Sequence, residues 1–157
     1  EFIDKDINIR YYLNEIILSF KEISKKEFVF NFDQDSNPKK ISKSIEIVYG
    51  LRNFIGNANK FAKNSIFINL KSDSQFTELT IEDDGNGYPR DIISKIGEPY
   101  LKSNYSKDKS KEGLGLGLFI GKTLLEKNFA SVNCRNSKTR NGAEVVIRWK
   151  NKELFNI

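Results

Sequence analysis

The stretch Glu82-Asp83-Asp84-Gly85-Asn86-Gly87-Tyr88-Pro89 decides how the chain folds and what its fold could hold. It follows Phe76–Glu82, in which apolar and polar residues alternate as in a half-buried strand. Two glycines separated by one residue let the backbone turn sharply and approach a ligand with no Cβ in the way. Asp83, at the end of this strand, could accept a hydrogen bond from an exocyclic amine such as that of adenine. An ordinary Asp/Asn/Gly turn is the alternative that this stretch leaves open.

Upstream, a long amphipathic helix is predicted from Ser42 to Ala62, followed by a strand from Ser65 to Leu70. Asn53, Asn57 and Lys60 lie near one face of this helix, because they are spaced by four and then three residues. Two carboxamides and an ammonium suit a hydrated Mg²⁺ and the phosphates it neutralises, since Mg²⁺ takes hard oxygen ligands and keeps several waters. The alternative is that all three face solvent.

Downstream, Gly113-Leu114-Gly115-Leu116-Gly117 opens a helix predicted to run to about Asn128. Glycine-rich backbone at a helix N-terminus offers free N–H donors and the positive end of the helix dipole, which suits phosphates. The motif alone is weak, because neither GxGxxG nor GxxxxGK[ST] is present. The preceding residues 101–112 are rich in Lys and Ser and predict a mobile loop.

The outer parts of the chain supply the remaining predicted elements: a helix over Ile7–Ser24, a strand over Phe28–Phe32, a short helix within 90–97, and strands over Ser131–Asn136 and Ala143–Lys150. Helices and strands are mixed without strict βαβ alternation. This favours an α+β fold, a two-layer sandwich whose mixed, mostly antiparallel sheet carries helices on one face. No repeat or linker interrupts the chain, so residues 1–157 are predicted to form a single domain.

Composition limits the chemistry further. The chain has 157 residues, 38% of them hydrophobic and 30% charged, which is typical of a globular domain. The net charge of +5 suits an anionic partner, unless it only reflects a Lys-rich composition. There is no histidine, and the single cysteine, Cys134, fits a reducing compartment and is interpreted as a small packed residue. No apolar run approaches the ~18–20 residues of a membrane span, and no signal peptide is visible.

Taken in order, the Asn/Lys helix, Asp-x-Gly-x-Gly after a strand, a loop, and Gly-x-Gly-x-Gly opening a helix resemble the histidine kinase branch of the GHKL ATPases, which have the Bergerat fold. The resemblance covers about Ile41 to Trp149. It implies that Asn57 coordinates Mg²⁺ and that Lys60 lies near the phosphates of ATP. It also implies that Asp83 reads the adenine amino group. The full nucleotide-binding set implied is Asn57, Lys60, Asp83, Gly85, Gly87, Tyr88, Tyr100, Lys102, Gly113, Leu114, Gly115, Leu116 and Gly117.

Details of the sequence narrow the resemblance. The runs Gly97-Glu98-Pro99-Tyr100 and Gly113–Ile120 are similar to the RegB/PrrB type of redox-responsive sensor kinases. Two positions depart from the usual family pattern. Gly97 stands where Phe is common, and Gly142-Ala143 stands where Gly-Thr often lies beside the adenine. The second departure removes one hydroxyl contact.

The resemblance implies that the γ-phosphoryl of Mg·ATP passes to a His on a separate dimerisation domain, and from there to a response regulator. Asn53, Asn57 and Lys60 are then the catalytic candidates. ATP-hydrolysing relatives of the gyrase and MutL types carry Glu at the position of Asn53, and an amide cannot act as a general base. This favours a protein acceptor over water. The resemblance also implies a cytoplasmic domain of a bacterial sensor kinase anchored in the inner membrane through segments outside this chain.

Two other functions stay open. A protein serine kinase of the anti-sigma-factor or mitochondrial dehydrogenase kinase branch would share the same motifs, since the acceptor lies outside the sequence. A nucleotide-binding regulatory module without transfer activity is the second. Nucleic acid is not expected as a partner, because the lysines of residues 101–112 have only Tyr105 beside them for stacking.

Overall fold

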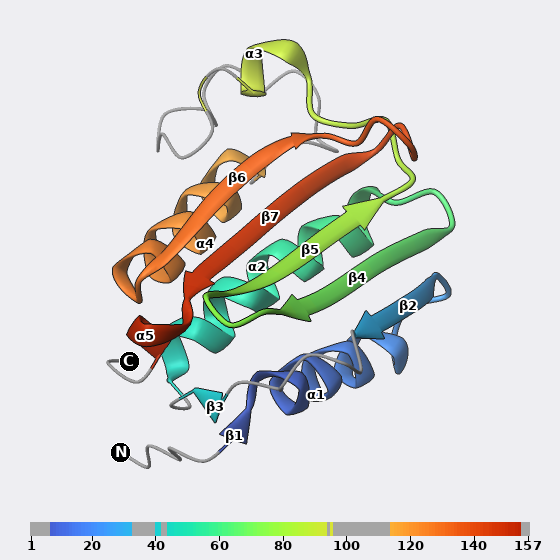
Figure 1. Ribbon diagram of the computed structural model, residues 1–157. Helices are drawn as coiled ribbons and strands as arrows, with labels where there is room; N and C mark the ends of the chain where they lie inside the picture. The colour runs from blue at the N-terminus through green and yellow to red at the C-terminus, as the bar shows by residue number, and fades with distance from the viewer. Residues whose placement is uncertain (1–6, 33–39, 42–43, 94, 96–113, 155–157) are drawn as a thin grey trace.

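The computed structural model describes residues 7–32, 40–41, 44–93, 95 and 114–154 (Figure 1). Five strands form one sheet in the spatial order β2-β4-β5-β7-β6. Neighbouring strands are antiparallel, except that β2 and β4 are parallel. The strands are β2 (Glu27–Phe32), β4 (Ser65–Ser72), β5 (Phe76–Asp83), β6 (Ala130–Asn136) and β7 (Ala143–Lys150).

The long helices cover one face of this sheet, and α2 and α4 lie behind it in Figure 1. The first helix is on the same face, because its Phe20 stacks on Phe28, which pairs in register with the buried Ile66. The predicted α+β sandwich is therefore confirmed. The long helices are α1 (Ile9–Lys21), α2 (Ile45–Phe61) and α4 (Leu114–Lys127).

Four short elements complete the described chain. α3 (Arg90–Ile93) follows the turn after β5 and lies within the range 90–97 predicted to be helical, of which residues 94, 96 and 97 are outside the described residues. A two-stranded ladder of β1 (Ile7–Asn8) and β3 (Lys40–Ile41) was not predicted. Nor was α5 (Asn151–Leu154), whose first side chain accepts a hydrogen bond from Thr77.

The helix ends differ from the predicted ones for local reasons. α2 begins at Ile45 rather than Ser42, because the Ser44 side chain caps it by accepting a hydrogen bond from the Ile47 amide. α1 ends at Lys21 rather than Ser24, and Ile23, two residues beyond that end, is 80% exposed. The Ser24 hydroxyl instead bonds to Asn59 of α2, so the chain leaves the helix to tie the two elements together.

Two glycines allow α2 and α4 to pack closely and antiparallel. A Cβ on Gly50 would lie 2.7 Å from Leu125, and a Cβ on Gly121 would lie 2.8 Å from the ring of Phe54. The same packing places Gly117, near the start of α4, against Asn57 near the end of α2. The glycine motif and the asparagine motif, 60 residues apart in the chain, therefore meet at one end of the helix layer.

Candidate functional site

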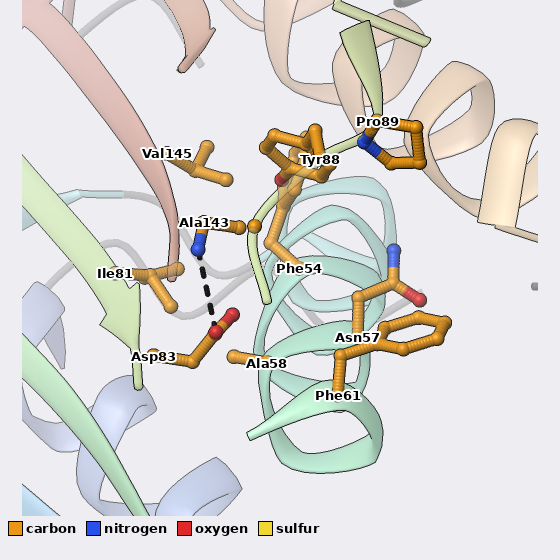
Figure 2. Close-up of a pocket in the computed structure, with 11 residues that line it drawn as sticks. Phe54, Asn57, Ala58, Phe61, Ile81, Asp83, Tyr88, Pro89, Ala143 and Val145 are labelled. Atoms are coloured by element: carbon orange, nitrogen blue, oxygen red, sulfur yellow. Dashed lines mark hydrogen bonds between the residues drawn. The ribbon is translucent and has the colours of Figure 1, made fainter. Parts of the chain in front are cut away.

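A pocket opens where the end of α2 faces β5 and β7 (Figure 2). It contains about 470 Å³ of empty space, counting the solvent at its mouth. Its walls are mainly apolar, with one carboxylate and one carboxamide among them, as is common in sites for small organic ligands. The lining residues are Phe54, Asn57, Ala58 and Phe61 from α2, Ile81, Asp83, Ala143 and Val145 from the sheet, and Gly87, Tyr88 and Pro89 from the segment after β5.

Asp83 is the buried charge of this pocket, with only 3% of its surface exposed. Its Oδ1 accepts hydrogen bonds from the amides of Gly85 at 2.8 Å and Ala143 at 3.3 Å. Within the described part of the chain, its Oδ2 has no hydrogen-bond partner, and Figure 2 shows the carboxylate pointing toward the space between α2 and the sheet. Burial raises the pKa of Asp83, and the two amide hydrogen bonds oppose that rise. Asp83 thus offers a desolvated acceptor to a ligand.

The neighbouring carboxylate, Asp84, has a structural task. Its oxygens accept hydrogen bonds from the amides of Lys63, Asn64 and Ser65, which form the turn between α2 and β4. Partial burial raises the pKa of Asp84, but these hydrogen bonds outweigh it and leave the pKa below its usual value. Asp83 is the last residue of β5, whereas Asp84 lies in the bend after it, so the two adjacent acids meet different partners and differ in role.

The glycines of the turn are needed for close packing around Asp83. A Cβ on Gly85 would lie 2.2 Å from the carbonyl oxygen of Phe61. Gly87 has φ of +77°, a conformation that side chains with a Cβ rarely adopt. Gly142 was named from the sequence only as part of the pair Gly142-Ala143. A Cβ at this position would lie 1.9 Å from the Asp83 carbonyl oxygen. These positions let three chain segments converge on one carboxylate.

Asn57 lies at the other side of the pocket from Asp83 (Figure 2). Its Nδ2 is buried and has no hydrogen-bond partner among the described residues. A Cβ on Gly117 would lie 3.3 Å from this nitrogen. Asn53 does not line the pocket, and its amide donates to the carbonyl oxygen of Tyr49 at 2.8 Å. An orphaned amide at a pocket wall is a group that a ligand can satisfy.

The structure brings only part of the predicted site set together. Asp83, Asn57, Gly87 and Tyr88 line the pocket. Lys60 is exposed, and its ammonium lies 5.3 Å from the ring centre of Phe61, a pocket residue. The first turn of α4 contains Leu114, Gly115, Leu116 and Gly117, and Leu116 is 42% exposed there. Tyr100, Lys102, Gly113, Gly97 and the predicted mobile loop 101–112 lie outside the described residues.

The apolar walls were missed by sequence reasoning. Phe54, Ala58 and Phe61 are absent from the predicted site set, although they follow one another at helical spacing on the same side of α2 as Asn57. That shared face was the available signal. Ala143 lines the pocket where the family often has Thr, and it contributes its backbone N–H to Asp83 rather than a hydroxyl to the pocket.

Asp83→Asn is expected to make the stability of the free protein less dependent on pH. The raised pKa means that the folded state holds this proton more tightly than the unfolded chain, so the free energy of unfolding falls as pH rises from the ordinary value of 3.8 through the folded pKa. An amide does not titrate, yet its oxygen can still accept from Gly85 and Ala143. In urea unfolding across this pH range, the free energy of unfolding of the variant should rise relative to that of the wild type as pH rises. A difference that stays constant with pH would contradict this.

Comparison with known proteins agrees with this geometry. The sequence profile of the histidine kinase-, DNA gyrase B- and HSP90-like ATPases matches residues 42–153. The sensor histidine kinase RegB of Cereibacter sphaeroides is 39% identical over 97 residues, which is 59% of this chain and 21% of RegB. The chain thus spans about a fifth of the length of the curated relatives that it matches first. The RegB-like resemblance predicted from the sequence is confirmed.

Solved structures share the fold. The catalytic domain of histidine kinase ThkA superposes with a TM-score of 0.76 at 20% identity, over 96% of this chain and 99% of that one. Full-length ShkA, solved with AMPPNP, gives a TM-score of 0.74 at 19% identity, over 94% of this chain and 30% of ShkA. No helix in the part of the chain that the structure describes is long and apolar enough to cross a membrane. The chain belongs to the family of histidine kinase-, DNA gyrase B- and HSP90-like ATPases.

Proposed function

We propose that this chain binds Mg·ATP in the pocket between α2 and the sheet and transfers the γ-phosphoryl group to a His on a separate helical dimerisation domain. The observation that carries the proposal is the pairing of two polar groups on opposite sides of an apolar pocket. Asp83 offers a buried acceptor, and Asn57 offers a buried amide without a partner. The first suits the base of the nucleotide, and the second suits the phosphate end.

At the base end, Asp83 would select adenine by charge and hydrogen-bond direction. Its Oδ1 is already bonded to two backbone amides, which fixes the carboxylate in place. The free Oδ2 can accept from the exocyclic amine of adenine, whereas guanine presents a carbonyl oxygen at the matching position and would be repelled. Phe54, Ile81 and Val145 supply apolar surface for a flat ring.

At the phosphate end, the start of α4 supports anion binding. Gly115 and Gly117 lie in its first turn, where helix N–H groups are unpaired and the dipole is positive. Gly117 is also in contact distance of Asn57, so phosphates held at this turn would lie beside that amide. The exposed Lys60 adds a positive charge near the same end of α2.

The residues present fit Mg²⁺. Among the residues that the structure describes, no group of three or more His, Cys, Asp or Glu converges as a metal site. A half-turn of the Asn57 side chain would present its oxygen where the orphaned Nδ2 now lies, and one such ligand suits a cation that keeps several waters and binds phosphate oxygens. When bound, Mg²⁺ would neutralise charge on the β- and γ-phosphates.

This chain's own part in the reaction would be positioning. In the transfer, a nitrogen of the acceptor imidazole forms a bond to the γ-phosphorus while the bond to the bridging oxygen breaks, and ADP leaves with that electron pair. The acceptor must come from elsewhere, because the chain has no His. Asn53 cannot activate water as a general base, and its amide is bonded to Tyr49. A dimerisation domain, a response regulator and anchoring of the whole kinase in a membrane belong to this proposal.

Phosphoryl transfer in trans tests the proposal. The chain is mixed with Mg·ATP labelled at the γ-phosphate and with the helical dimerisation domain of a RegB-type kinase. We expect slow, acid-labile labelling of that domain, weak because no covalent tether raises the effective concentration, and negligible release of free phosphate by the chain alone. Replacing the acceptor His by Ala should remove the label. Rapid ATP hydrolysis by the chain alone would contradict the proposal, and acid-stable label would instead favour the serine kinase branch.

A further inference from the structure

One wall of the pocket is formed by irregular backbone. Residues 86–89 leave the sheet after β5 and belong to no helix or strand, yet Gly87, Tyr88 and Pro89 all line the pocket. Irregular backbone of this kind is only as rigid as its hydrogen bonds to the rest of the fold. The partners of this segment therefore decide how well the wall is formed.

The backbone of Tyr88 is paired with a side chain rather than with a strand. The Tyr88 N–H donates to Oδ1 of Asn136 at 2.6 Å, and the Tyr88 carbonyl accepts from Nδ2 of Asn136 at 3.1 Å. Within residues 7–32, 40–41, 44–93, 95 and 114–154, neither backbone group has another recorded partner. The carboxamide of Asn136 has the same donor and acceptor as a peptide group, so it serves as a single rung of a β-ladder.

The fit depends on the residue before Tyr88. A Cβ on Gly87 would lie 2.7 Å from Oδ1 of Asn136, so the carboxamide can reach the Tyr88 backbone only because position 87 is glycine. The positive φ of Gly87 turns the chain at this point. The glycine and the asparagine, 49 positions apart in sequence, are therefore complementary parts of one junction.

A second residue of the same strand lies near the Tyr88 side chain. Cys134 lies two positions before Asn136 on β6, so both point to the same side of the strand. The Cys134 thiol lies close enough to the Tyr88 hydroxyl for each group to influence the pKa of the other, and Tyr88 is 8% exposed. The edge strand β6 thus bonds the backbone of a residue that follows β5 and places a second side chain near its hydroxyl, although β7 lies between the two strands.

We infer that Asn136 is a positioning residue for nucleotide binding, which holds the Gly87–Pro89 wall in its binding conformation without touching the nucleotide. Asn136 does not line the pocket, and Tyr88 does. Its effect on affinity therefore passes through the wall. The inference rests on the proposed function, since it assigns Asn136 a role at that same site.

Asn136→Ala and Asn136→Asp test this inference, with Asn133→Ala as the control. Asn133 is exposed, lies on the same strand and points to its other side. In the nucleotide-free protein, Asn136→Ala should speed amide exchange of Tyr88 by about tenfold, with little change at Ile81 or Ile147. ADP affinity of the folded protein, titrated calorimetrically in Mg²⁺ well below the unfolding midpoint, should fall about fivefold, as expected for losing exposed hydrogen bonds. Asn133→Ala should alter neither quantity.

Asn136→Asp keeps the acceptor for the Tyr88 N–H and loses the donor to the Tyr88 carbonyl, so we expect it to be intermediate in both measurements. It also serves if the alanine variant does not fold. Faster Tyr88 exchange together with ADP affinity within twofold of the wild type would overturn the positioning role. Unchanged Tyr88 exchange would overturn the junction itself. A wild-type protein that binds no ADP or ATP would overturn the proposed function, while the exchange measurement would still report on the junction.

Discussion

Asp83→Asn should weaken ATP binding by about 1–3 kcal/mol, or roughly five- to 150-fold, the range for a hydrogen bond to a charged group. The carboxylate is 3% exposed and has one oxygen free for the pocket, so no water substitutes readily for its bond to the adenine amine. The amide of the variant can present its nitrogen at this position, where its N–H donor would face the donor of the adenine amine. The variant should also lose its preference for ATP over GTP. Calorimetric titration with both nucleotides measures the two effects.

Asp84→Asn is the matched control for this substitution. Asp84 is the next residue, but its oxygens bond the amides of Lys63, Asn64 and Ser65, outside the pocket lining. We expect the control to lower the free energy of unfolding and to leave nucleotide selectivity unchanged. Wild-type ATP affinity in Asp83→Asn, or an equal loss of selectivity in both variants, would remove Asp83 from the binding site.

Asn57→Ala should lower the rate of phosphoryl transfer to a supplied dimerisation domain by about 100-fold or more. It should also remove the Mg²⁺ dependence of ATP binding. Stability should change little, because the Nδ2 of Asn57 is buried without a partner and its removal breaks no hydrogen bond from that atom. Transfer is measured with labelled ATP, and binding is titrated with and without Mg²⁺.

A control for Asn57→Ala is available on the opposite side of the molecule. Asn69 of β4 lies away from the pocket lining, and Asn69→Ala should keep both transfer and Mg²⁺ dependence. If Asn57→Ala phosphorylates the acceptor at the wild-type rate, Asn57 is not the metal ligand. If it unfolds, the structural interpretation of its orphaned amide is wrong.

Sequence reasoning succeeded where the signal was local. The alternation in Phe76–Glu82 and the helical spacing in α2 predicted elements that the structure contains. The two glycines after β5, separated by one residue, predicted the sharp turn. The order of the motifs predicted the family. These signals depend on neighbours within a few residues, and the physics of helices and strands relates them directly to local structure.

Long-range pairing was not predictable in the same way. Nothing near Asn136 in the sequence indicates that its carboxamide pairs with Tyr88. Likewise, nothing near Asp84 indicates that it bonds the turn between α2 and β4 while Asp83 faces the pocket. Phe54 and Phe61 have the spacing of core residues, and only the gap between α2 and β5 makes them pocket walls. The short ladder of Ile7–Asn8 with Lys40–Ile41 likewise depends on contacts between distant segments.

The measurement that bears most directly on the central claim is a calorimetric titration of the wild-type chain with ATP and with GTP, each with Mg²⁺. We predict one ATP site per chain and GTP affinity lower by about tenfold or more, because Asp83 presents an acceptor where guanine carries a carbonyl oxygen. Equal affinity for the two nucleotides, or no binding of ATP, would contradict the account.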